Sequence, residues 1–156
     1  MDWLSMHKDD THLRLTSRSL PIALLRARET VMGSFRDMLA KSGISEQKWR
    51  VLRVLFEKGP MEQTAIAEGA CLLLPSLTRI LASMEKEGLV TRATDQKDRR
   101  KTIVVLAPAG KHLIAAHSEE SAAITAQLEQ SFGKDRIEAL LDLLEDLHTH
   151  TPINKS

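Results

Sequence analysis

Apolar residues recur at three- and four-residue spacing along most of the chain, and this period predicts a mainly helical protein. Residues 20–40 carry a first stripe of this kind. A second helix is expected from the N-cap residue Ser45 to the Gly59-Pro60 stop, with Glu46 in its electropositive first turn. The stripe of the first helix contains Leu24, Val31, Phe35 and Met38, and that of the second contains Trp49, Leu52, Val54, Leu55 and Phe56.

Residues 61–88 have the pattern of a helix-turn-helix. A short helix over 61–69 is followed by a tight turn at Ala70-Cys71 and a longer helix that begins near Pro75 and ends at Gly88. The inward face of the longer helix is expected to comprise Leu74, Leu77, Leu81 and Met84, whereas its opposite face is small, polar or basic.

A β-hairpin is expected next, because residues 89–93 and 102–106 are short, apolar and rich in β-branched side chains. Its tip, residues 94–101, carries the cations Lys97, Arg99, Arg100 and Lys101. A long helix then starts at Ala107-Pro108 and runs to about Ser131, and a leucine-rich helix follows Gly133. The sequence therefore predicts a mainly α fold with a small β-hairpin, in which the terminal helices require a partner.

Charge is unevenly distributed along the chain. Residues 79–111 hold eight Lys or Arg against four Asp or Glu, whereas residues 112–150 hold two against eight. The first region favours a polyanion. Since only 3% of residues are aromatic and Tyr is absent, base stacking is disfavoured as a means of recognition.

The outward face of the helix from Pro75 suits the reading of base edges in a DNA major groove. Ser76, Thr78, Arg79 and Ser83 are polar without bulk, and Arg79 is the candidate for a bidentate contact to guanine. The hairpin tip suits a phosphate backbone or a minor groove, with Asp98 orienting the guanidinium of Arg100. The alternatives are a solvated helix face and a basic loop that binds an acidic protein.

At these residues the chain resembles the MarR family of bacterial transcription regulators, particularly its homoprotocatechuate operon repressors. The helix-turn-helix is followed by EKEGLVTR and then by DQKDRRKTIVVLAPAG, whose Asp98-Arg99-Arg100 matches the D-x-R wing motif of the family. The similarity extends through ALLRARETVMGSF, SEQKWRVLRVLFEKG and PSLTRILASMEKEGLV. Ala107 departs from the family, which usually has Thr there, so the long helix loses a side-chain cap.

The resemblance implies a winged helix-turn-helix over residues 45–107, flanked by dimerisation helices in residues 20–44 and 108–150, with residues 1–19 as an N-terminal arm. It further implies a homodimer on a pseudo-palindromic operator, with two recognition helices in major grooves and two wings in minor grooves. The expected function is a repressor released by a small aromatic carboxylic acid or phenol. A winged helix used only for protein association is the alternative from another class.

Family members bind aromatic acids between the dimerisation helices and the DNA-binding lobe, which makes Arg28 a candidate carboxylate ligand. Arg28 falls in the middle of the apolar stripe of the first helix, where a cation needs a partner. Phe35 and Trp49 are expected to face the ring, and His117 to meet a phenol hydroxyl. The alternatives are a salt bridge for Arg28 and a structural interface role for His117.

Other chemistries find little support in the sequence. The single cysteine, Cys71, excludes an internal disulfide; a thiol-based redox sensor using Cys71 is the remaining alternative, although its apolar turn predicts a buried, inert thiol. No catalytic constellation, metal site or cofactor motif is recognised. The N-terminus resembles no signal peptide and no apolar run reaches about 18 residues, so a cytoplasmic protein without a membrane span is expected.

Overall fold

The computed structural model describes residues 12–151, which fall into two units. The first unit ends at Ser34 and the second begins at Phe35. Of the predicted N-terminal arm, residues 1–11 lie outside the described range, and Thr16–Arg18 form a short 3-10 helix, η1. The first predicted helix is confirmed as α1, Leu20–Ala40, which runs from the first unit into the second.

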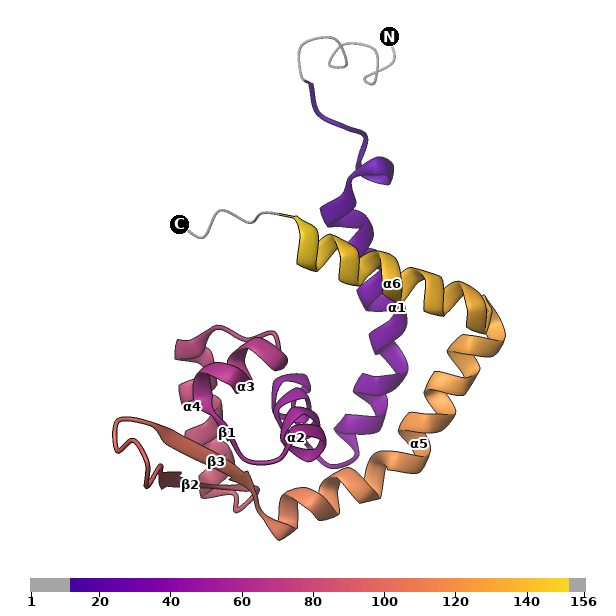
Figure 1. Ribbon diagram of the computed structural model, residues 1–156. Coiled ribbons are helices and arrows are strands. Elements are labelled where there is room, and N and C mark those ends of the chain that lie inside the picture. Colours follow the sequence, from indigo (N-terminus) through magenta and orange to yellow (C-terminus); the bar gives the residue numbers. More distant parts are fainter. Residues whose placement is uncertain (1–11, 152–156) are drawn as a thin grey trace, which may run out of the picture. The chain divides into compact units, whose positions relative to one another are not determined.

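The second unit contains the predicted helix-turn-helix, hairpin and C-terminal helices (Figure 1). Helices α3 and α4 form the helix-turn-helix, and α5 and α6 follow the hairpin in the chain. No single helix among residues 12–151 is long and apolar enough to cross a membrane. Helices α3 and α4 together reach that length and apolar content, but the chain bends by 106° between them. The elements are α2 Glu46–Lys58, β1 Met61–Glu62, α3 Gln63–Gly69, α4 Leu74–Lys86, β2 Val90–Thr94, β3 Thr102–Leu106, α5 Pro108–Phe132 and α6 Lys134–His150.

The sheet has three antiparallel strands in the order β1-β3-β2. The predicted hairpin is confirmed, with Val90 opposite Leu106 and Thr94 opposite Thr102. The helix predicted from Met61 was wrong for its first two residues, because Met61 and Glu62 pair with Val104 and Ile103 of β3. A strand of two residues is too short to show the alternation of apolar and polar positions that would predict it. It forms because the edge of β3 is available for backbone pairing.

The core of the second unit lies where α2, α3 and α4 meet β2 and β3. From α4, Leu77, Leu81 and Met84 are fully buried, as predicted. Leu74 was also predicted to face inward, but it is 43% exposed, because it is the first residue of α4 and lies ahead of the turns that pack on the core. Helix α2 contributes Trp49, Val51, Leu52 and Leu55.

Two local predictions at helix ends are confirmed and one at the turn is wrong. The Ser45 hydroxyl accepts a hydrogen bond from the Lys48 amide at 3.2 Å, and Ala107 provides no side-chain cap for α5. The Cys71 thiol, however, is exposed rather than buried. Its backbone is left-handed, with φ of 55°, and the next residue, Leu72, packs against the core in its place.

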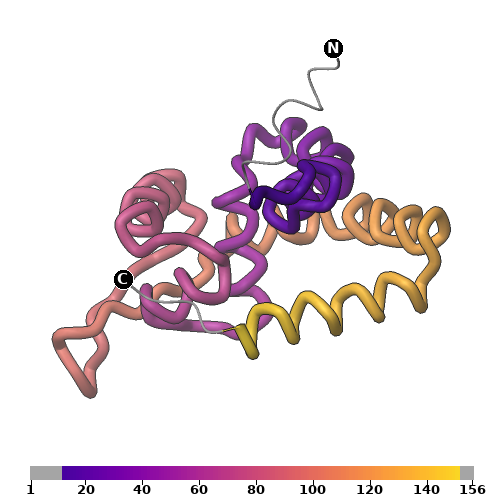
Figure 2. The backbone as a smooth tube through the Cα atoms, turned by 90° about the horizontal axis from the view of Figure 1, so that it is seen from above, coloured from indigo at the N-terminus to yellow at the C-terminus, as the bar shows by residue number. Residues whose placement is uncertain are grey.

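Helices α5 and α6 meet at a sharp turn at Gly133, whose φ is 105° (Figure 2). The predicted break at this glycine is confirmed. Helix α6 buries no residue within the chain, although it carries a repeated leucine pattern. Its exposed leucines are Leu140, Leu141, Leu143, Leu144 and Leu147.

The start of α5 is held against the hairpin at a close approach. The Leu89 carbonyl accepts a hydrogen bond from the Ala107 amide at 3.0 Å. A Cβ atom placed on Gly110 would lie 2.5 Å from that same carbonyl oxygen and 2.6 Å from a methyl carbon of Leu106. Only glycine therefore allows α5 to leave the sheet at this point.

We expect Gly110→Ala to destabilise the protein by about 1–3 kcal/mol, because the added methyl group overpacks a rigid backbone contact. The free energy of unfolding in urea measures the effect. Gly33→Ala is the matched control, since a Cβ atom there meets nothing within 4 Å and alanine is the better helix former. Equal stability of Gly110→Ala and wild type would contradict the close approach.

Candidate functional site

Helix α4 presents the predicted recognition residues on its solvent side. Arg79 is exposed, and Ser76 is half-buried in the first turn, where the N-cap residue Leu73 offers no side-chain hydrogen bond. Thr78 donates its hydroxyl hydrogen to the Leu74 carbonyl at 3.0 Å. The first-turn amides are thus open to an anion, and Arg79 is the long cationic side chain of this face.

The other end of α4 is braced by two ion pairs. Glu87 pairs with Lys48 of α2 and accepts a hydrogen bond from Ser83 at 3.1 Å, and these contacts, Lys48 foremost, lower the pKa of Glu87. The Glu85 carboxylate accepts a hydrogen bond of 3.0 Å from Nε of Arg92 in β2, and this bond lowers the pKa of Glu85. Ser83 is therefore already bonded within the protein, although it was predicted to meet DNA.

The wing is the loop between β2 and β3, and its predicted internal ion pair is present. Arg100 donates from Nε to Asp98 Oδ1 at 3.1 Å, and its backbone amide donates to the same oxygen at 3.1 Å. These bonds, the side-chain one foremost, hold the pKa of Asp98 below its ordinary value. Arg100 remains 92% exposed, so Asp98 orients the guanidinium without covering it.

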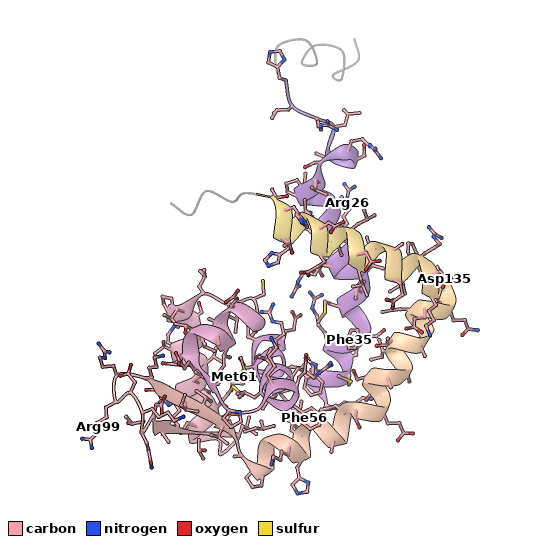
Figure 3. The ribbon with its side chains drawn as sticks, viewed as in Figure 1. Arg26, Phe35, Phe56, Met61, Arg99 and Asp135 are labelled. Carbon is pink, nitrogen blue, oxygen red and sulfur yellow. The ribbon has the colours of Figure 1, made fainter. Side chains whose placement is uncertain are left out.

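The remaining wing cations differ in availability. Lys101 lies 3.1 Å from a carboxylate oxygen of Glu62, a contact that raises the lysine pKa and joins the wing to β1. Lys97 and Arg99 are exposed, and Figure 3 shows Arg99 at the far end of the hairpin, pointing away from the sheet. Lys97, Arg99 and Arg100 are therefore the exposed wing cations that have no ion pair to another element among the described residues.

A groove of about 690 Å³ lies between α2 and α5. Arg53 and Glu57 contribute its charged groups from α2, and Trp49 and Phe56 contribute its aromatic rings. Phe56 is 59% exposed, so much of its ring is open to solvent. The wall from α5 consists of Ile114, Ser118, Ser121, Ala122, Thr125, Ala126 and Glu129.

Of the predicted ligand residues, only Trp49 lines this groove. Phe35 packs against the core. His117 is 5% exposed, lies 2.5 Å from the Ser42 hydroxyl and meets the Trp49 ring edge-on at 5.7 Å. The His117 ring therefore has a hydrogen-bond partner in Ser42 and a packing partner in Trp49, as expected for a structural histidine. Arg28 belongs to the first unit, where its guanidinium lies 3.8 Å from Glu29.

Sequence reasoning missed Arg53 and the exposure of Phe56. A signal was present, because Trp49, Arg53 and Phe56 follow each other at i, i+4 and i+7 and share one face of a helix. An arginine inside an aromatic stripe differs from the purely apolar stripe that packs into a core. The burial of Val51, Leu52 and Leu55 on the neighbouring face masked that difference.

The described residues contain no group of three or more His, Cys, Asp or Glu side chains arranged to hold a metal ion. His148 and His150, at the end of α6, are exposed. The described residues present a polar helix face on α4, a basic hairpin and an amphipathic groove.

A family model described as "MarR family" matches residues 44–102, the span from α2 to the start of β3. The chain is 38% identical over 128 residues to the homoprotocatechuate degradative operon repressor of Escherichia coli, covering 82% of this chain and 86% of that protein.

Two solved structures extend the likeness to the fold. The crystal structure of NadR in complex with 4-hydroxyphenylacetate superposes with a TM-score of 0.78 at 34% identity, covering 89% of this chain and 99% of NadR. The repressor CouR bound to a 23-mer DNA duplex gives a TM-score of 0.77 at 28% identity, covering 88% and 99% of the two chains. With its helix-turn-helix, its wing and these relatives, the chain belongs to the MarR family of winged helix-turn-helix transcriptional regulators.

Proposed function

We propose that this regulator is a homodimeric repressor whose operator affinity falls when a small aromatic carboxylate binds between α2 and α5. The groove carries the proposal, because it combines the guanidinium of Arg53 with the rings of Trp49 and Phe56. Glu57 and Glu129 also line it and repel an anion, so the carboxylate is expected to bind at Arg53, the one cation among the lining residues. A guanidinium and apolar ring walls are the groups that recognise an aromatic acid. NadR, which binds 4-hydroxyphenylacetate, and the homoprotocatechuate repressor support the same ligand class.

For the operator, α4 is proposed to enter the major groove with Ser76, Thr78 and Arg79 toward the bases. Ser83 would join them by exchanging its hydrogen bond to Glu87 for one to DNA. The wing is proposed to reach the flanking minor groove with Arg100, which Asp98 holds in one orientation. Lys97, Arg99 and Lys101 would add contacts to phosphates. The binding of CouR to a DNA duplex supports this use of the shared fold.

Dimerisation is proposed to use α1, α5 and α6, because their apolar stripes are incompletely covered within the chain. Leu24, Leu25 and Val31 of α1 and the leucines of α6 are exposed. A second copy would bury both sets and place two α4 helices on successive major grooves of a pseudo-palindromic site, about 34 Å apart. Such a regulator acts in the cytoplasm and, like its relatives, is not an enzyme.

The effector would act through α2, which contributes to both the groove and the core beneath α4. A ring wedged between α2 and α5 would turn the winged helix relative to the dimerisation helices. The spacing of the two α4 helices would then no longer match one turn of DNA, and the repressor would dissociate. Arg28 remains a second candidate for the carboxylate, from the same chain or its partner.

Arg100→Ala is expected to weaken operator binding roughly tenfold or more, because a hydrogen bond to a charged group contributes about 1.5–3 kcal/mol. Asp98→Asn should weaken it less, since the guanidinium remains and only its orientation is lost. Fluorescence anisotropy on a duplex selected from random sequences measures both. Lys134→Ala, a charge removed from the start of α6, is the control, and an Arg100→Ala affinity equal to that of wild type would refute the wing assignment.

The Asp98–Arg100 pair also makes a pH prediction. Because the pKa of Asp98 is lowered in the folded protein, the pair is intact above the ordinary carboxyl pKa and is lost as the pH falls through the lowered value. Titration of the Asp98 side-chain carbon by NMR should show the low pKa in wild type and a rise in Arg100→Ala. Lys97→Ala, in the same loop, should leave it unchanged; an identical pKa in all three proteins would rule out the ion pair.

Arg53→Ala is expected to reduce the affinity for 4-hydroxyphenylacetate roughly tenfold or more, from the loss of a charged hydrogen bond. Calorimetry with the acid and with its neutral amide separates charge recognition from ring packing. Wild type should prefer the acid, Arg53→Ala should bind both alike, and Lys58→Ala should behave as wild type. If Arg53→Ala still prefers the acid and Arg28→Ala does not, Arg28 of α1 binds the carboxylate and the assignment to Arg53 is wrong.

A further inference from the structure

A second groove, of about 450 Å³, lies on the other side of α2, against the recognition helix. The wall from α4 consists of Ser76, Arg79, Ile80 and Ser83, which share one face at helical spacing. The wall from the first turns of α2 consists of Ser45, Gln47, Lys48 and Arg50, and Leu72 of the preceding turn completes the lining.

The lining of this groove is suited to a hydrophilic anion. Its cations are Lys48, Arg50 and Arg79, and the lining includes no acidic residue and no aromatic ring. The groove between α2 and α5, by contrast, includes two aromatic rings. A phosphodiester needs guanidinium and hydroxyl donors but no ring wall.

Arg50 is the residue whose environment in the groove is incomplete. Its Nε is buried and has no hydrogen-bond partner among the residues that the structure describes. Lys48, in contrast, is already paired with Glu87. Because buried donors in proteins are almost always bonded, Arg50 is the groove cation that lacks an acceptor for a buried N–H.

Because the buried Nε is closed to solvent, an acceptor from outside the protein reaches it only when the guanidinium turns outward into the groove. The position of the groove indicates which acceptor would then be available. An α-helix with its side chains is about 10–12 Å across and nearly fills a major groove roughly 12 Å wide. Residues beside such a helix therefore meet the phosphate row that borders the groove. Arg50 is such a residue, because it lines the same groove as Ser76, Arg79 and Ser83 of α4.

We propose that Arg50 of α2 binds a backbone phosphate of the operator at the edge of the major groove that α4 occupies. The proposal rests on the DNA-binding function described above and adds a contact outside the recognition helix and the wing. Such a contact sets the register of α4 on the duplex and adds affinity without reading sequence. The effector groove and the phosphate site would then lie on two sides of the same helix.

The dependence of operator affinity on salt tests the contact. For Arg50→Gln we expect an affinity roughly three- to tenfold lower at low salt and a slope of log K against log salt reduced by about one unit per protomer. Arg50→Lys should keep most of the slope, and Lys58→Gln, the same charge change at the far end of α2, should keep all of it. An unchanged slope in Arg50→Gln would overturn the proposal.

Neutral methylphosphonate linkages, placed one at a time in the selected duplex, test the same contact in the unmodified protein. One position at the edge of the major groove should weaken wild type but have no further effect on Arg50→Gln. Additive losses at every position would overturn the proposal, as would binding of inorganic phosphate at Arg50 without any effect on the slope. A wild-type protein that binds no duplex at all would instead refute the DNA-binding function itself.

Discussion

The packing of α2 into the core is the interaction on which the rest of the second unit depends. Val51, Leu52 and Leu55 are essentially inaccessible to solvent, so one face of α2 is committed to the core that it shares with α3, α4 and the sheet. The two flanks of the same helix are left to line grooves, one toward α5 and the other toward α4. A single buried face therefore positions both a candidate effector site and part of the candidate DNA interface.

This arrangement gives a physical route for regulation. A closely packed core transmits a displacement of α2 to α4 rather than absorbing it, because interiors have few voids into which side chains can move. The Lys48–Glu87 ion pair adds a second connection, from the start of α2 to the end of α4. A ligand that moves α2 is thus expected to move the recognition helix with it, and DNA held by α4 is expected to resist that movement and weaken the ligand.

Three contacts join the wing to its surroundings and limit its freedom. Its base is paired with β1, Lys101 meets Glu62 of that strand, and Arg92 meets Glu85 of α4. Only the tip, with Arg99 and Arg100, projects. Because exposed ion pairs are individually weak, the backbone pairing of β1 with β3 is the stronger constraint, and the ion pairs set side-chain direction.

The sequence by itself determined the helices, the hairpin, the Ser45 cap and the Asp98–Arg100 contact, because each depends on local periodicity, turn residues or neighbours two to four positions apart. Tertiary structure decided the rest. Strand β1 exists because β3 offers an edge, and Cys71 is exposed because Leu72 occupies the core. Arg50 and Arg53 line different grooves because different helices face the two flanks of α2. Periodicity identifies which face of a helix is buried, but not which neighbour covers its borders.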